Sequence, residues 1–157
     1  MLSDATASKT PVVSTFHSFC VRLLRRDGAS LSEIREGFTR RFTIYDDDDQ
    51  VALLKSIYKQ LGLDEKFMQY RASLSRISHG KSNNETAQDW YKAATDPKLT
   101  RLAKIYELYE ERLHQANALD FDDLLLESVR LLRHDDAIRA LYNRHFEFVM
   151  IDEYQDT

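Results

Sequence analysis

Two adjacent carboxylates, Asp152 and Glu153, follow a nearly unbroken apolar run at residues 146–151. Such a run is typical of a strand buried on both faces of a parallel sheet, and ligands gather at the carboxyl ends of such strands. One carboxylate would hold the Mg²⁺ that bridges nucleotide phosphates, and the next would orient and deprotonate the attacking water. The pattern is therefore compatible with nucleotide hydrolysis. Because acids also end strands simply by entering solvent, these two residues alone leave a structural interpretation open.

A second group of polar residues lies near the start of the chain. Thr15, His17 and Ser18 stand at the beginning of an expected amphipathic helix that ends at Gly28. Hydroxyls and a helix N-terminus donate hydrogen bonds that suit a phosphate. Helix capping by Thr15 and a satisfied polar role for His17 are the competing interpretations.

Arginines concentrate in residues 20–45, although the chain as a whole carries a formal net charge of -4. A local basic surface would steer DNA to this part of the chain, whereas a solvated helix face accounts for the same residues almost as well. The arginines concerned are Arg22, Arg25, Arg26, Arg35, Arg40 and Arg41.

The tripeptide Gly80-Lys81-Ser82 imitates the end of a phosphate-binding loop. That loop needs another glycine five residues before Gly80, where this chain has Ser75, and it follows a strand rather than the helix expected here. We therefore expect Lys81 to lie in a flexible, Asn-rich loop, where it contacts the DNA backbone or nothing at all.

The expected elements between these groups are almost all helices. They include one that follows the Asp46–Asp49 run and stops before Gly62, one from about residue 64 to 79, and a long amphipathic one over 98–115. A short strand is predicted at residues 12–15 and a buried strand at 146–151, and roughly 120 helical residues between them exceed any ordinary crossover connection. The sequence predicts a mainly α chain, in which a helical domain is inserted between two strands of a parallel α/β domain. Asp46–Asp49 and Asp120–Asp123 are expected to cap helices rather than to bind metal.

Composition restricts the setting. The single cysteine, Cys20, cannot form an internal disulfide, which favours a reducing, cytosolic environment. No stretch approaches the ~20 apolar residues that cross a bilayer, and the first residues lack the apolar core of a signal peptide, so we expect no membrane association.

Three strings resemble motifs of the UvrD/Rep/PcrA-type superfamily 1 DNA helicases. DEYQDT at residues 152–157 resembles motif II, STFHSFCVRLLRRDG at 14–28 resembles the motif with a TFHS core, and LDFDDLL at 119–125 resembles the helix before motif II. The resemblance covers most of the chain. It implies that residues 1–20 are an edge of the RecA-like ATP-binding domain 1A, 21–144 the helical subdomain 1B, and 145–157 the Walker B strand and DEYQDT box of 1A.

The resemblance also implies roles for individual residues. Asp152 would bind Mg²⁺ with ATP, and Asp152, Glu153 and Gln155 would form the catalytic set of the intact enzyme. The implied DNA contacts are Thr15, His17, Ser18, Arg22 and Lys81.

The resulting expectation is a fragment of a cytoplasmic, ATP-dependent 3′-to-5′ DNA helicase. It would act on single strands and single/double-strand junctions together with the remaining domains 1A, 2A and 2B. Because the sequence contains no phosphate-binding loop, the chain by itself is expected not to hydrolyse ATP. Two alternatives stay open: the motor subunit of an AddA/RecB-type helicase-nuclease, and a non-catalytic helical module that binds DNA or protein.

Overall fold

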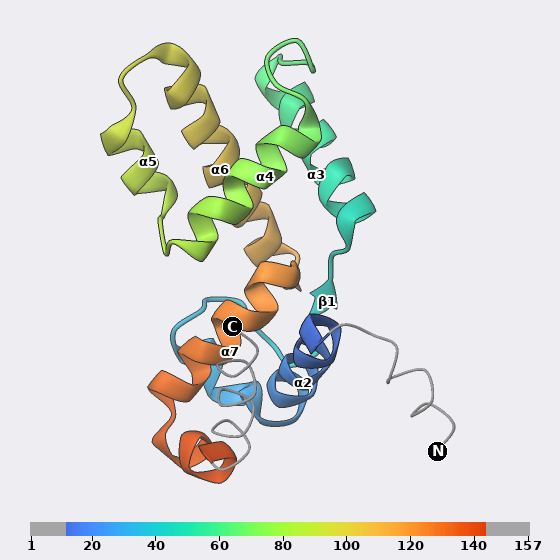
Figure 1. Cartoon of the computed structure of the whole chain (residues 1–157), viewed down its shortest axis with the longest axis vertical. Coiled ribbons are helices and arrows are strands. Elements are labelled where there is room, and N and C mark those ends of the chain that lie inside the picture. Colours follow the sequence, from blue (N-terminus) through green and yellow to red (C-terminus); the bar gives the residue numbers. More distant parts are fainter. Residues whose placement is uncertain (1–11, 144–157) are drawn as a thin grey trace. The chain divides into compact units, whose positions relative to one another are not determined.

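The computed structural model describes residues 12–143, with side chains from Phe16 onward. Within this range the chain is mainly helical with a small parallel sheet, which confirms the predicted fold class. The elements in Figure 1 are α2 (Val12–Asp27), the 3-10 helix η1 (Gly28–Glu33), β1 (Thr43–Ile44), α3 (Asp47–Leu61), α4 (Tyr70–Ser82), α5 (Ala87–Ala93), α6 (Pro97–Gln115), β2 (Ala118–Leu119) and α7 (Phe121–His134).

The strand predicted at residues 12–15 is wrong, because helix α2 already begins at Val12. Val12, Phe16 and Cys20 are spaced by four residues, so the helical periodicity continues back through the β-branched residues. Strand propensity is a weak preference that such a pattern overrides. The strand predicted at 146–151 lies outside the described residues.

The chain divides into two compact units, which are described separately. Unit 1 comprises Met1–Arg40 and Leu125–Thr157, and unit 2 comprises Arg41–Leu124. In unit 1, Cys20, Leu23 and Leu24 of α2 are buried, as are Leu31 and Leu131. Burial raises the pKa of the Cys20 thiol, which is therefore protonated at neutral pH.

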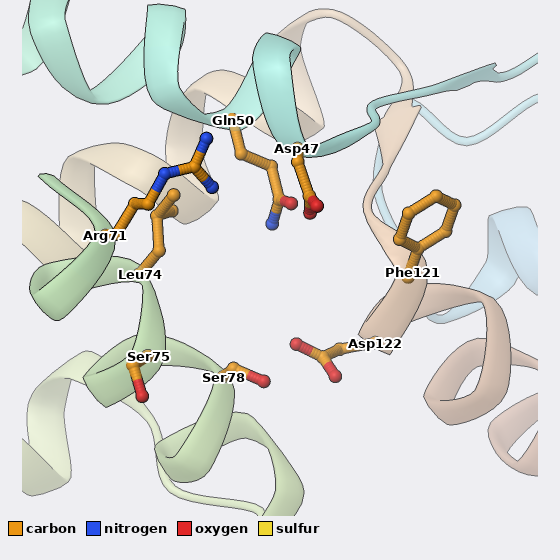
Figure 2. Close-up of a pocket in the computed structure, with 8 residues that line it drawn as sticks. All are labelled: Asp47, Gln50, Arg71, Leu74, Ser75, Ser78, Phe121 and Asp122. Atoms are coloured by element: carbon orange, nitrogen blue, oxygen red, sulfur yellow. The ribbon is translucent and has the colours of Figure 1, made fainter.

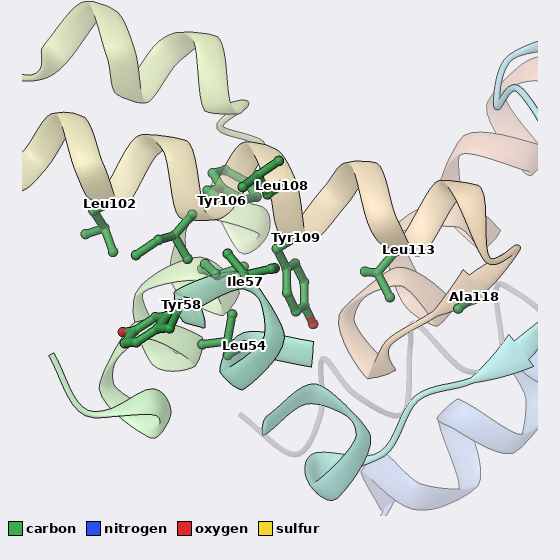
Figure 3. Close-up of a cluster of buried hydrophobic side chains, with 11 residues drawn as sticks. Leu54, Ile57, Tyr58, Leu102, Tyr106, Leu108, Tyr109, Leu113 and Ala118 are labelled. Atoms are coloured by element: carbon green, nitrogen blue, oxygen red, sulfur yellow. The ribbon is translucent and has the colours of Figure 1, made fainter. Parts of the chain in front are cut away.

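Helix α6 is the centre of unit 2, where it contacts both α3 and α5. Its inward face carries Ile105, Tyr109 and Leu113, which are fully buried in one cluster with Leu54 and Ile57 of α3. Figure 3 shows Tyr109 beside Ile57 and Leu54, and Leu113 farther along α6. Full burial of one such side chain contributes about 1.5–3 kcal/mol. The amphipathic helix predicted over 98–115 is confirmed, and it starts one residue earlier with Pro97 in its first turn.

An acidic residue caps α3, as predicted. The Asp46 carboxylate accepts a hydrogen bond from the backbone amide of Asp49, and the Asp49 carboxylate accepts one from the amide of Asp46. These bonds, chiefly the one from Asp49, lower the pKa of Asp46. Gly62 ends the helix in the left-handed conformation at φ 69°. The Asp46–Asp49 run is therefore a helix start in the structure.

Helix α4 differs from its prediction at both ends. Residues 64–69 precede the helix instead of forming its first turns, and α4 continues through Gly80 and Lys81 to Ser82. It stops only where Asn84 takes a left-handed conformation at φ 58° and the amide of Glu85 donates to the Gly80 carbonyl at 2.9 Å. Asn84 thus takes the place that glycine usually has after a helix.

The sheet of unit 2 was not predicted. Thr43 pairs with Ala118 and Ile44 with Leu119 in parallel. Each strand has only two residues, too few for a period-2 pattern to be visible in the sequence. The pairing joins the segments before α3 and before α7, which are far apart in the chain.

Gly80 is needed because Trp90 of α5 approaches the backbone of α4. A Cβ atom at Gly80 would lie 2.6 Å from Cζ2 of Trp90, closer than real side chains come. The indole cannot retreat easily, because it packs on Tyr106 with ring centroids 4.5 Å apart. Gly80 therefore permits the contact between α4 and α5.

We predict that Gly80→Ala destabilises the chain by about 1–2 kcal/mol, since the overpacking cost exceeds the gain in helix propensity. Urea unfolding followed by circular dichroism measures this change. Gly28→Ala is the matched control, because a Cβ there meets Phe38 at an ordinary 3.6 Å. Equal stability of both variants would contradict the proposed role of Gly80.

Candidate functional site

Helix α2 presents an exposed polar face in unit 1. Ser18 and Arg22 are exposed and lie four residues apart, so they are neighbours on the helix surface, whereas His17 is half-buried. The structure does not describe the side chain of Thr15. Of the residues expected to contact DNA, Ser18 and Arg22 are thus brought together on one face.

Further arginines of unit 1 surround this face. Arg25 donates to the Arg40 carbonyl at 3.5 Å and Arg40 donates to the Arg26 carbonyl at 3.2 Å, so these exposed side chains are tied to each other's backbone. Arg35 does not belong to this surface, because it is 4% exposed and pairs with the buried Glu127 at 3.4 Å. The basic surface predicted over 20–45 therefore includes fewer arginines than that segment contains.

The predicted nucleotide site at Asp152, Glu153 and Gln155 lies outside the described residues. Between residues 12 and 143, no group of three or more acidic, histidine or cysteine side chains could hold a metal ion.

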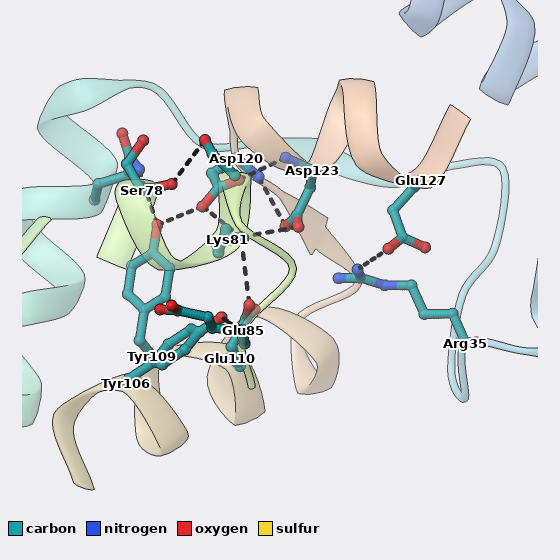
Figure 4. A network of polar contacts seen from close by, with 12 residues as sticks. Arg35, Ser78, Lys81, Glu85, Tyr106, Tyr109, Glu110, Asp120, Asp123 and Glu127 are labelled. Carbon is teal, nitrogen blue, oxygen red and sulfur yellow. Dashed lines mark hydrogen bonds and ion pairs between the residues drawn. The ribbon is translucent and has the colours of Figure 1, made fainter. Parts of the chain in front are cut away.

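The placement of Lys81 in a flexible loop is wrong. Lys81 lies in the last turn of α4 and is only 4% exposed. Its ammonium nitrogen is 2.9 Å from Asp120 Oδ2, 2.8 Å from Asp123 Oδ1 and 3.5 Å from Glu110 Oε1. Figure 4 shows these carboxylates converging on it from α6 and from the start of α7. A role of Lys81 in DNA contact gains no support from this position.

The charges of this Lys81 cluster (Lys81, Glu110, Asp120 and Asp123) stabilise one another. Burial alone would lower the pKa of Lys81, but the carboxylates of Asp123, Glu110 and Asp120 outweigh it and hold the pKa well above its usual value. Burial likewise would raise the pKa of Asp120, yet Lys81 and a hydrogen bond from Tyr109 lower it. Lys81 and Asp120 therefore keep their charged forms at neutral pH.

Neutral groups add hydrogen bonds to the cluster. The Tyr109 hydroxyl donates to Asp120 Oδ2 at 2.7 Å, and Gln50 of α3 donates to the same hydroxyl at 2.8 Å. Asp120 Oδ1 accepts from the amide of Asp123 at 2.8 Å, which caps α7 as predicted. Sequence reasoning missed Tyr109 and Glu110, which look like ordinary members of the amphipathic helix α6. The available signal was Asn84, because an asparagine can take the left-handed conformation that follows a helix, and a helix that ends there includes Lys81.

A shallow hollow of about 290 Å³ opens beside α3, α4 and α7 in unit 2 (Figure 2). Asp47 and Asp122 face it together with Arg71 and the hydroxyl of Ser78. Two carboxylates against one guanidinium do not suit a phosphate, because phosphate sites concentrate positive charge. The hollow does not resemble the nucleotide site expected from the sequence.

Comparison with known proteins gives the family. The family model described as the UvrD/REP helicase N-terminal domain matches residues 2–157. The chain belongs to this family. It is 38% identical over 145 residues to the ATP-dependent DNA helicase PcrA of Staphylococcus aureus, and 37% identical to that of Staphylococcus epidermidis. Each alignment covers 92% of this chain but 19% of the relative, so the chain spans about a fifth of their length.

The UvrD/REP match includes all three strings that carried the resemblance, because it runs from residue 2 to the last residue. The recognition made from those strings is therefore confirmed. Among the described residues of this family member, no helix is long and apolar enough to cross a membrane.

We predict that Lys81→Met destabilises the chain by about 3–5 kcal/mol at pH 7, because it leaves buried carboxylates without their cation. Denaturant unfolding measures the loss. Lys92→Met is the matched control, since this exposed lysine of α5 should change stability by less than about 0.5 kcal/mol.

The stability lost in Lys81→Met should depend on pH, and it should become smaller as the pH falls. A carboxylate whose pKa is lowered on folding stabilises above its ordinary pKa, which is 3.8 for Asp120, and loses this contribution as the pH falls through the folded value. The wild type and Lys81→Met should therefore converge in stability below about pH 4. A difference that stays constant into acid would contradict an ionic cluster.

Proposed function

We propose that the chain is the part of an ATP-dependent, 3′-to-5′ DNA helicase that comprises subdomain 1B and the adjoining edges of domain 1A. The observation that carries this proposal is the UvrD/REP family match, which includes both the TFHS string and the DEYQDT box. The relatives are named ATP-dependent DNA helicases. In this proposal residues 1–20 and 145–157 belong to 1A and residues 21–144 to 1B, and the remaining partners are domains 2A and 2B.

The proposed ATPase residues are those of the DEYQDT box. Carboxylate and amide oxygens are hard ligands that suit Mg²⁺, so the donor set fits a magnesium-nucleotide site. We assign Asp152 to the metal, Glu153 to orienting and deprotonating the attacking water, and Gln155 to the same site. Bound Mg²⁺ would neutralise charge on the phosphates.

The proposed DNA contact lies on α2. The exposed Ser18 and Arg22 share one face of the helix, and Arg25 and Arg40 add positive charge in the same unit. Phosphate oxygens accept hydrogen bonds from hydroxyls and guanidinium groups, and this contact carries no base information. We include Thr15 and His17 in this contact on the resemblance alone.

We predict that the chain binds oligothymidylate and forked DNA at low salt, and that Arg22→Ala weakens both. Loss of one phosphate contact should make the slope of log affinity against log salt concentration shallower by about one. Fluorescence anisotropy at several salt concentrations measures this. Arg133→Ala removes an exposed arginine from the end of α7 and is the control. Equal weakening of DNA binding by both variants would indicate nonspecific electrostatic attraction and count against a DNA contact on α2.

We also predict that the 157-residue chain does not hydrolyse ATP, with or without DNA, because its sequence has no glycine-rich loop to hold the β and γ phosphates. A phosphate-release assay tests this. DNA-stimulated hydrolysis that Glu153→Gln abolishes would contradict the prediction, while hydrolysis unaffected by Glu153→Gln would indicate a contaminating ATPase.

A further inference from the structure

Trp90, the only tryptophan of the chain, is held in place from three sides. Its ring packs on Tyr106, and its Cζ2 lies against the backbone of Gly80. Its indole nitrogen donates to Glu85 Oε1 at 2.9 Å. Even so, the side chain remains half-buried. A large aromatic ring that is fixed yet open on one side offers contact area without an entropic cost of ordering.

The open side of Trp90 borders a hollow of about 410 Å³ between α4, α5 and α6. Its apolar lining includes Trp90, Ala93 and Leu99, and none of these three side chains is buried. This volume falls in the range of sites that accept large apolar groups. The polar residues of the lining are Arg76, His79, Glu85 and Asp89.

The charges around the hollow decide between a nucleic acid and a protein. A base could stack on tryptophan, but its phosphates would meet two carboxylates and a single guanidinium. The Asp89 carboxylate accepts hydrogen bonds from Thr86, which lower its pKa and keep it ionised. An apolar side chain with a neighbouring Lys or Arg meets both the lining and the charge.

We propose that this hollow is a docking site for a partner protein, which inserts one aromatic or branched aliphatic side chain beside Trp90 and sets a Lys or Arg against Glu85 and Asp89. A single buried anchor with charged neighbours is a common way for a groove to bind a peptide segment. The site lies wholly within unit 2, and it is independent of the ATP and DNA roles proposed above.

The test uses the full chain and two capped tripeptides, acetyl-Arg-Phe-Lys-amide and acetyl-Glu-Phe-Glu-amide. Because Trp90 is the only tryptophan, a change in its fluorescence reports binding at this place. We expect saturable binding of the basic peptide in the millimolar range or tighter. Ala93→Arg fills the hollow with a repelling charge and should weaken that binding by about tenfold, which corresponds to ~1.4 kcal/mol.

Two further variants separate recognition from folding. Ala72→Arg places the same substitution at an exposed position of α4 outside the hollow and should leave the affinity within about twofold. Glu85→Gln retains an acceptor for the indole but removes the charge, and should weaken the basic peptide several-fold. The proposal is overturned if the basic peptide does not saturate, if the acidic peptide or oligothymidylate binds the hollow equally well, or if Ala93→Arg and Ala72→Arg behave alike.

Discussion

The ammonium of Lys81 among three carboxylates is the interaction on which unit 2 depends. It joins α4 to α6 through Glu110 and to the start of α7 through Asp120 and Asp123. Removing a charge from water costs several kcal/mol, and only close partners with satisfied hydrogen bonds offset that cost. Burial and the nearby Asp120 raise the pKa of Tyr109, so its hydroxyl keeps the proton that it donates to this carboxylate. The charges and hydrogen bonds therefore tie the end of α4 to α6 and to Asp120 and Asp123 within unit 2.

The cluster also explains why Gly80-Lys81-Ser82 resembles a phosphate-binding sequence without being one. In a phosphate loop the glycine lets the backbone approach an anion, and the lysine neutralises it. Here Gly80 lets the ring of Trp90 approach, and Lys81 neutralises carboxylates of its own chain. In both cases the glycine permits a close approach and the lysine offsets negative charge, but here the partners are residues of the same chain. Three consecutive letters cannot distinguish these cases, because the partner of Lys81 stands 39 residues away in the sequence.

What could be predicted from the sequence is what nearby residues determine. Asp46 and Gly62 mark the ends of α3 because capping acts within four residues, and the apolar spacing of α6 identifies its buried face. The start of α2 and the end of α4 were mispredicted where two local signals compete: strand propensity against helical spacing, and glycine against a left-handed asparagine. Of the candidate site, the family and the exposed Ser18 and Arg22 followed from the sequence. The burial of Arg35 did not, since its partner Glu127 is 92 residues away by number.

The charges beside the two proposed contacts differ, and this supports the division of function proposed here. In unit 1, Arg22, Arg25 and Arg40 are exposed, whereas Arg35 and Arg130 both pair with the buried Glu127. In unit 2, Lys81 pairs with carboxylates. Each of the two hollows described above has two carboxylates against one arginine. Phosphate affinity grows with exposed cations, which is why we propose the DNA contact on the α2 face. An acidic rim around Trp90 instead favours a basic protein segment, which would leave DNA and a protein partner on different units without competing for the same charges.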